Sequence, residues 1–341
     1  WSEGFKAPNL EVLNAGEMAR YLTFPDYIYC EAAVRAEQIS GYSQCTKSYD
    51  VTWHMKGNDD LEPETSENVS VGGVFTPQFL PDNWGNMKFT LDAWRIQIDD
   101  QIGVTPTLDV IIHDLYLRTQ QGTTDPRVFR ADPSSDDIAL FSGTGLDAVG
   151  EIQYVQTDYA NLNSLEARGV DFSFDWSSAK TEYGSFSFNF AVSKLLNFKQ
   201  ALTQEMQDAK AAQDAGLLDA YIVIGTADEV GRSGKKPEWK GSSRFIWHYE
   251  DFIYRLSAQY TGSVLDGKYA SGLDFEVPSI VTWNTSAQYQ LDESILDGVI
   301  AEIGVRNIFD KEPPLNASGN YLANLYLPFS RYVYASLEKK F

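Results

Sequence analysis

The chain has 341 residues, of which 43% are hydrophobic and 13% aromatic, so it can form an ordered structure with a substantial core. Its formal net charge of −21 argues against nucleic-acid binding, because phosphate backbones are bound by clustered Lys and Arg side chains that this sequence lacks. No apolar stretch of about 18 residues occurs, which excludes a transmembrane helix but not membrane-spanning strands of about 9 to 11 alternating residues.

Residues 15–57 read as a long loop that contains both cysteines of the chain, Cys30 and Cys45. In an oxidising compartment we expect the two cysteines to form a disulfide that fastens this loop, and two free thiols are the alternative.

From Glu67 onward, apolar residues recur at every second position, which is the period of a β-strand with one apolar and one polar face. Phe190 and Asn189, for example, fall on opposite faces of one such strand. About nine strands are predicted, near residues 65–78, 85–101, 150–177, 182–198, 241–250, 252–265, 276–291, 297–309 and 329–341.

The connections between these strands are unequal in length. Short links alternate with long ones, so that an up-and-down meander would carry tight turns at one end and elaborate loops at the other. This asymmetry is typical of an outer-membrane barrel, although a soluble β-sandwich also alternates. Strand length and the aromatic load of the apolar face favour the barrel. The short links lie near 79–84, 178–181, 250–252 and 292–296, and the long ones near 102–149, 199–240, 266–275 and 310–328.

Two long connections carry local patterns of their own. The acidic stretch "DPSSDD" (Asp132 to Asp137) is read as a solvated acidic loop, with a Ca²⁺ site as the alternative. Residues 200–221 have apolar residues at helical spacing with Gly216 as a stop, so we expect a helix packed on its loop, with a substrate-closing lid as the alternative.

No catalytic, cofactor or metal site is predicted. His54, His113 and His248 are far apart in the sequence and lack metal-ligand spacing, and no nucleophile or phosphate-loop motif occurs. Rigid aromatic rings are favoured in binding sites, so aromatic residues of the loops are candidate substrate contacts, although each is individually more often structural. These candidates are Tyr27, Tyr29, Trp53, Trp239, Tyr321 and Tyr326.

The last segment, "RYVYASLEKKF", places Leu337, Ala335 and Val333 on the face of the terminal aromatic residue Phe341. An alternating strand that ends on an aromatic residue resembles the signal by which the barrel assembly machinery of Gram-negative bacteria recognises its substrates. Lys339 departs from that pattern, which prefers an apolar residue there.

Four further blocks occur in order along the chain and resemble segments of TonB-dependent outer-membrane receptors. They are "SEGFKAPNLEVL" (Ser2 to Leu13), "NDDLEPETSENVSVGGVF" (Asn58 to Phe75), "ANLNSLEARGVDFSFDW" (Ala160 to Trp176) and "GVRNIFDKEPP" (Gly304 to Pro314). Within them, Gly169 suggests a bulge or a close strand approach, or simply a small lumen-facing residue, and Asn307 and Asp310 are expected to shape a turn.

The resemblance implies an all-β fold, a transmembrane antiparallel up-and-down β-barrel of about 22 strands with a plug domain inside it. Residues 1–341 would form the C-terminal portion of such a barrel, with the plug and the earlier strands outside this chain. The implied location is the outer membrane of a Gram-negative bacterium.

The implied function is import of a scarce small molecule, by default a ferric siderophore, with cobalamin or an oligosaccharide as alternatives and with no enzymatic step. Implied partners are the TonB complex, engaged through the missing N-terminal part, lipid and lipopolysaccharide of the outer membrane, and the barrel assembly machinery. A plugless binding or adhesion barrel and a soluble lectin-like sandwich are the competing classes.

Overall fold

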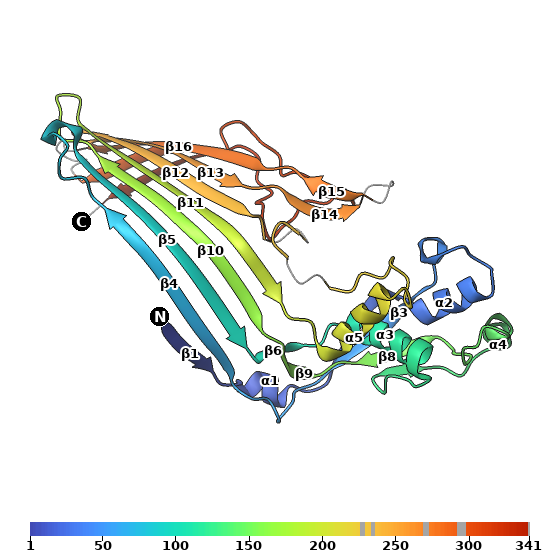
Figure 1. The fold of residues 1–341 in the computed structure, drawn as a ribbon. Helices are drawn as coiled ribbons and strands as arrows, with labels where there is room; N and C mark the ends of the chain where they lie inside the picture. Colours follow the sequence, from blue (N-terminus) through green and yellow to red (C-terminus); the bar gives the residue numbers. More distant parts are fainter. Residues whose placement is uncertain (226–228, 233–235, 269–272, 292–297, 340–341) are drawn as a thin grey trace.

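The computed structural model describes residues 1–225, 229–232, 236–268, 273–291 and 298–339 (Figure 1). One ten-stranded antiparallel sheet dominates it, with the strand order β1-β4-β5-β10-β11-β12-β13-β16-β17-β18. No helix within these ranges is long and apolar enough to cross a membrane. The predicted link 292–296 and the terminal Phe341 lie outside the described residues.

All nine predicted strands are present in the sheet, and β1 adds a tenth. The strands are β1 (Ser2–Lys6), β4 (Glu64–Phe75), β5 (Asn86–Asp99), β10 (Leu165–Ser177), β11 (Ser185–Gln200), β12 (Trp239–Tyr249), β13 (Phe252–Thr261), β16 (Ile280–Leu291), β17 (Val299–Arg306) and β18 (Tyr332–Lys339).

The predicted strand 150–177 is wrong in extent. Its first part forms β8 (Ile152–Gln156) and β9 (Tyr159–Leu162), which belong to two other sheets, and only β10 joins the large one. Within β9, the side-chain amide of Asn161 donates to the carbonyls of Glu62 and Asp100, which fixes this short strand beside the ends of the large sheet.

The register of the sheet confirms the predicted separation of faces. Phe188 pairs with Phe245 and Phe245 with Leu256, so one face, here called the outer face, carries a continuous apolar surface. On the opposite inner face, Arg244 pairs with Ser257 and Ser257 with Asn284. In β18, Val333, Ala335 and Leu337 pair with the outer-face residues Val305, Ile303 and Ala301.

A β-bulge marks the glycine that the sequence singled out. The β10–β11 register shifts between Arg168 and Gly169, and a Cβ at Gly169 would overlap the ring of Trp94 on β5. The Trp94 indole donates to Asp171 over a distance of 2.9 Å. Both sequence-based explanations that involve the backbone, a bulge and a close approach, therefore apply.

The long connections gather at one end of the sheet and the short turns at the other (Figure 1). The sequence patterns predicted mostly loop for residues 15–57 and 102–149. This prediction is wrong, because these segments fold together with residues 199–225.

The helices are α1 (Leu10–Asn14), α2 (Tyr27–Arg35), α3 (Thr107–Tyr116), the π-helical turn Leu117–Gln121, α4 (Ser135–Phe141) and α5 (Gln204–Asp214). A four-stranded sheet has the order β2-β3-β8-β7, with β2 (Met18–Pro25), β3 (Ser48–Met55) and β7 (Val128–Arg130).

Two short ladders complete the fold. One pairs β6 (Gln101–Val104) with β9 where the loops leave the large sheet, and there the Glu64 carboxylate accepts from the Ile102 amide at 2.8 Å. The other pairs β14 (Val264–Lys268) with β15 (Asp274–Val277), and packs beside the connection 307–331 through Tyr326. Single 3₁₀ turns lie at Tyr42–Gln44 and Asp82–Trp84.

A pair of neighbouring substitutions tests the two faces. Phe190→Arg places a cation on the outer face and is expected to cost about 2–4 kcal/mol of barrel stability if that face meets hydrocarbon near the midplane. Asn189→Arg places the same charge on the inner face, where Asn189 already donates to Asp175 at 2.7 Å, and is expected to be tolerated. Unfolding of the barrel in lipid vesicles, followed by urea titration, measures both; equal losses would contradict the assignment.

Candidate functional site

The three long segments share one apolar core, and we call residues 24–57, 105–157 and 202–225 the loop body. Its core includes Ile28 of α2, Ile112 of α3, Val155 of β8 and Met206 of α5, each no more than 2% exposed. The loop body is therefore one folded unit beyond the end of the sheet, and its side chains are fixed by packing.

The predicted helix in 200–221 is confirmed, with the shorter bounds of α5. Thr203 caps its first turn by accepting from the Met206 amide, and Gly216 follows its end with a φ of 75°. Met206, Ala209 and Ala212 are buried, and α5 packs against α3. This arrangement agrees with a helix packed on its loop.

A disulfide joins Cys30 of α2 to Cys45, with their Cα atoms 5.6 Å apart. It closes the segment that follows α2 against the helix. Beside it, Tyr42 is 2% exposed and its hydroxyl donates to Glu31 at 2.7 Å. The acidic stretch 132–137 caps α4, because Ser134 and Asp137 bond reciprocally at its N-terminus.

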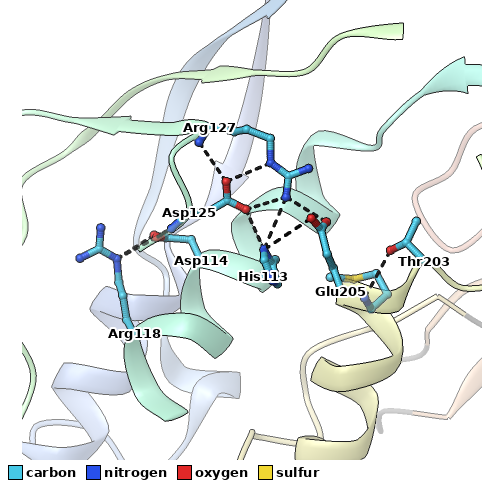
Figure 2. Close-up of polar contacts among 8 residues, drawn as sticks. His113, Asp114, Arg118, Asp125, Arg127, Thr203 and Glu205 are labelled. Carbon is cyan, nitrogen blue, oxygen red and sulfur yellow. Dashed lines mark hydrogen bonds and ion pairs between the residues drawn. The ribbon is translucent and has the colours of Figure 1, made fainter. Parts of the chain in front are cut away.

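A cluster of charged residues connects α3, the segment that precedes β7, and α5 (Figure 2). The Asp125 carboxylate accepts from His113 Nδ1 at 2.8 Å and from Arg127 Nη2 at 2.6 Å. Arg127 also donates to Glu205 at 2.9 Å, so one guanidinium joins two of the three segments. Burial alone would raise the pKa of Asp125. Hydrogen bonds from His113 and Arg127 outweigh burial and hold this pKa well below its usual range.

A second, more deeply buried arginine connects the third segment. Arg130 donates to both carboxylate oxygens of Asp26, at 2.8 and 3.0 Å, and lies 3.6 Å from the carboxylate of Asp114. The side chains of Arg130, Asp26 and Asp114 are 7%, 0% and 1% exposed. Asp114 also accepts from Arg118 one turn along the helix at 2.9 Å. These contacts hold the loop body together where its apolar core is interrupted.

Sequence reasoning missed this charged cluster. The spacing of Asp125, Arg127 and Arg130 in "DPRVFR" is the only local signal, and it does not identify partners such as Asp26 and Glu205, which are 104 and 78 residues away.

The predicted substrate contacts in the loop body are mostly occupied by structural roles. Tyr27 is only 8% exposed and stacks on Tyr42, so its ring packs inside the loop body. Tyr29 packs edge-on against Phe141 with Lys47 over its ring. The Trp53 indole donates to the Thr157 hydroxyl, and Arg20 lies over the ring.

The other three aromatic candidates lie nearer the large sheet. Trp239 begins β12 on the same face as Phe245, and Lys194 covers its ring at 4.8 Å, so the register places Trp239 on the outer face. Tyr321 is 40% exposed in the connection 307–331. Tyr326 is 5% exposed and lines a cavity of about 620 Å³ between this connection and the inner face of β13, β16 and β17.

Removing the buried arginine tests the role of the charged cluster. Arg130→Met leaves Asp26 and Asp114 buried beside a neutral side chain, so the loop body should lose roughly 3–5 kcal/mol of stability. The control Lys210→Met removes an exposed pair with Asp214 and should cost less than about 1 kcal/mol. Native-state hydrogen exchange of α2 and α3 measures both effects, and similar protection in the two variants would contradict the role of Arg130.

The loop body is also expected to respond to pH. Burial, with a smaller contribution from Glu205, raises the pKa of Asp109 to about 6 from an ordinary value of 3.8. Because the pKa of Asp109 is higher in the folded than in the unfolded chain, protonation of Asp109 favours the folded state. This contribution to stability is complete below about pH 4 and is lost as pH rises through about 6. At pH 7 Asp109→Asn should therefore be more stable than the parent by on the order of 2 kcal/mol. Hydrogen exchange of α3 at pH 5 and 7 checks this, and an unchanged difference between the two proteins would contradict it.

Comparison with known proteins shows which family has this fold. The family described as TonB dependent receptor-like, beta-barrel, matches residues 1–308. No curated protein sequence matches the chain.

Solved structures with the same fold share little sequence with the chain. The siderophore receptor PirA from Acinetobacter baumannii is 16% identical with a TM-score of 0.55, and the chain is covered to 98% and that receptor to 37%. A mutant of the ferric enterobactin receptor PfeA from Pseudomonas aeruginosa is 15% identical with a TM-score of 0.52, with coverage of 98% and 36%. The outer membrane transporter YddB from Escherichia coli is 12% identical with a TM-score of 0.50, with coverage of 86% and 35%.

The chain thus spans little more than a third of the length of these receptors. Barrels of the matched family lie in the outer membrane of Gram-negative bacteria, and the family consists of transporters rather than enzymes. The family match over nine-tenths of the chain, the ten-stranded antiparallel sheet and the shared fold lead to one assignment: this chain belongs to the TonB-dependent receptor family and forms part of its β-barrel.

Proposed function

We propose that residues 1–341 are the C-terminal portion of the barrel of an active outer-membrane importer. The observation that carries the proposal is that β1 and β18 stand at the two ends of an open ten-stranded sheet. Hydrocarbon offers no partner for the backbone groups of an edge strand, so both edges require further strands in a membrane. Barrels of this transporter type have about 22 strands and a plug in the lumen, which the rest of the protein would supply.

The proposed substrate is a ferric siderophore that enters through the loop body and the polar inner face. Support comes from neighbours of the same fold that are siderophore receptors, including a PfeA variant in complex with enterobactin. Energy would come from the TonB complex, which would act on the plug. The loop body supports selective entry, because it is a rigid folded unit at the end of the sheet where the long connections gather (Figure 1).

The outward partners follow from the surfaces. The apolar outer face, with Phe188 and Phe245 at its centre, would contact membrane lipid, and the rim would contact lipopolysaccharide. The barrel assembly machinery would recognise the terminal strand β18, whose Val333, Ala335 and Leu337 lie on the outer face.

Uptake by whole cells tests the import function. The full-length protein, produced in a Gram-negative host that lacks its own siderophore receptors, should give accumulation of radioactive iron from a ferric siderophore, and loss of TonB should abolish it. Cells with an empty vector are the control for diffusion. Accumulation that persists without TonB, or uptake of labelled cobalamin or oligosaccharide instead of iron, would overturn the corresponding part of the proposal.

A further inference from the structure

The cavity beside Tyr326 has two chemically different walls. Inner-face residues of β13 and β16 form a polar wall, in which the cross-strand pair Gln259 and Thr282 makes no side-chain hydrogen bond to another described residue. The connection 307–331 supplies an apolar and aromatic wall through Tyr326 and Phe329. Such a mixture of apolar surface with a few free polar groups is typical of small-molecule sites.

Two cations line the same cavity without a counter-charge. Arg306 at the end of β17 and Lys311 in the connection make no ion pair with any residue that the structure describes. The Arg306 guanidinium instead lies over the ring of Tyr334, 5.6 Å from its centre. In a chain of net charge −21, two unneutralised cations in one concavity create a local positive potential that differs from the average.

The wall that the connection 307–331 forms is held in place by hydrogen bonds. Asn307 has a φ of 50°, and its side chain bonds the backbone of Lys311 in both directions and donates to the carbonyl of Phe329 at 3.2 Å. The Arg331 amide donates to Asp310 at 2.6 Å. Both ends of the connection are thus fastened together, so little ordering is required when a ligand enters.

Tyr326 lines the cavity from the connection and is fixed by packing. Its ring packs against Val264, Val277 and Ile280, and its buried hydroxyl has no hydrogen-bond partner among the described residues. Burial raises the pKa of Tyr326, so the phenol stays protonated at neutral pH.

We propose that this cavity is a subsite for a carboxylate group of a small-molecule solute, held by Arg306 at the end of β17 and by Lys311 in the connection. Arg306 presents the planar fork that matches a carboxylate, and Lys311 adds a second charge from the connection. The inference deepens the proposed import function, since it names the chemistry that the solute would carry, and its biological meaning rests on that function.

Binding of citrate to the full-length protein in detergent tests the subsite. Isothermal titration should detect citrate binding that weakens as salt is added, and the neutral trimethyl ester of citrate should not bind. Arg306→Gln and Lys311→Gln should each weaken binding roughly tenfold or more, the range expected for loss of a charged hydrogen bond. Arg244→Gln is the matched control, because Arg244 lies on the inner face of β12 outside the cavity, and it should change the Kd less than about twofold.

The outcomes separate cleanly. Absence of citrate binding, equal binding of the ester, or equal weakening by Arg244→Gln would each overturn the subsite. Heat-modifiable migration in gel electrophoresis reports whether each variant is folded, and Lys311→Gln, in an exposed connection, decides the question if Arg306→Gln fails to fold. The assay needs no TonB, so citrate binding without cellular uptake would retain the subsite and remove the import function, whereas uptake without binding would do the reverse.

Discussion

Every strand of a membrane barrel must pair its backbone groups with neighbouring strands, because hydrocarbon provides no alternative donors or acceptors. This constraint accounts for the long continuous ladders from β4 to β18 and for the regular separation of an apolar outer from a polar inner face. It also limits irregular backbone to places where something else satisfies it. The bulge at Gly169 is such a place, because the ring of Trp94 fills the space and its indole bonds Asp171.

Beyond the rim the constraint disappears, and a different balance of forces holds the loop body. An apolar core unites α2, α3 and α5, but Arg130 and Arg127 join segments that are far apart in sequence through buried or half-buried carboxylates. A buried ion pair is weak evidence for stability compared with an apolar replacement. Its directional bonds do require one particular arrangement of three loops, which fixes the shape that the outer surface presents.

The sequence predicted the barrel strands well because a period of two is a local signal, and the pairing of neighbours in a meander follows from chain order. It could not predict the loop body in the same way. The parallel pairing of β3 with β8 and the bond between Asp26 and Arg130 join residues about a hundred positions apart, and neither leaves a periodic trace. The helix α5 was predictable because its apolar residues have helical spacing, whereas its neighbour α3 lies in a segment read as loop. Aromatic type alone does not reveal the surroundings of a side chain: Tyr27 stacks on Tyr42, and the strand register places Trp239 on the outer face.

Net charge is an average over the whole chain, so it does not locate the charges that a solute could meet. A charge of −21 describes the whole chain and suggests little affinity for anions, but recognition depends on the few charges that remain unpaired within reach of a ligand. In the loop body, Arg127 and Arg130 are neutralised by the carboxylates they bridge, so they contribute cohesion and no free positive field. Arg306 and Lys311 make no ion pair with any described residue, and the cavity beside the connection 307–331 is lined by both of them. The distribution of ion pairs, more than their number, therefore separates the cations that hold this fold together from those available to a solute.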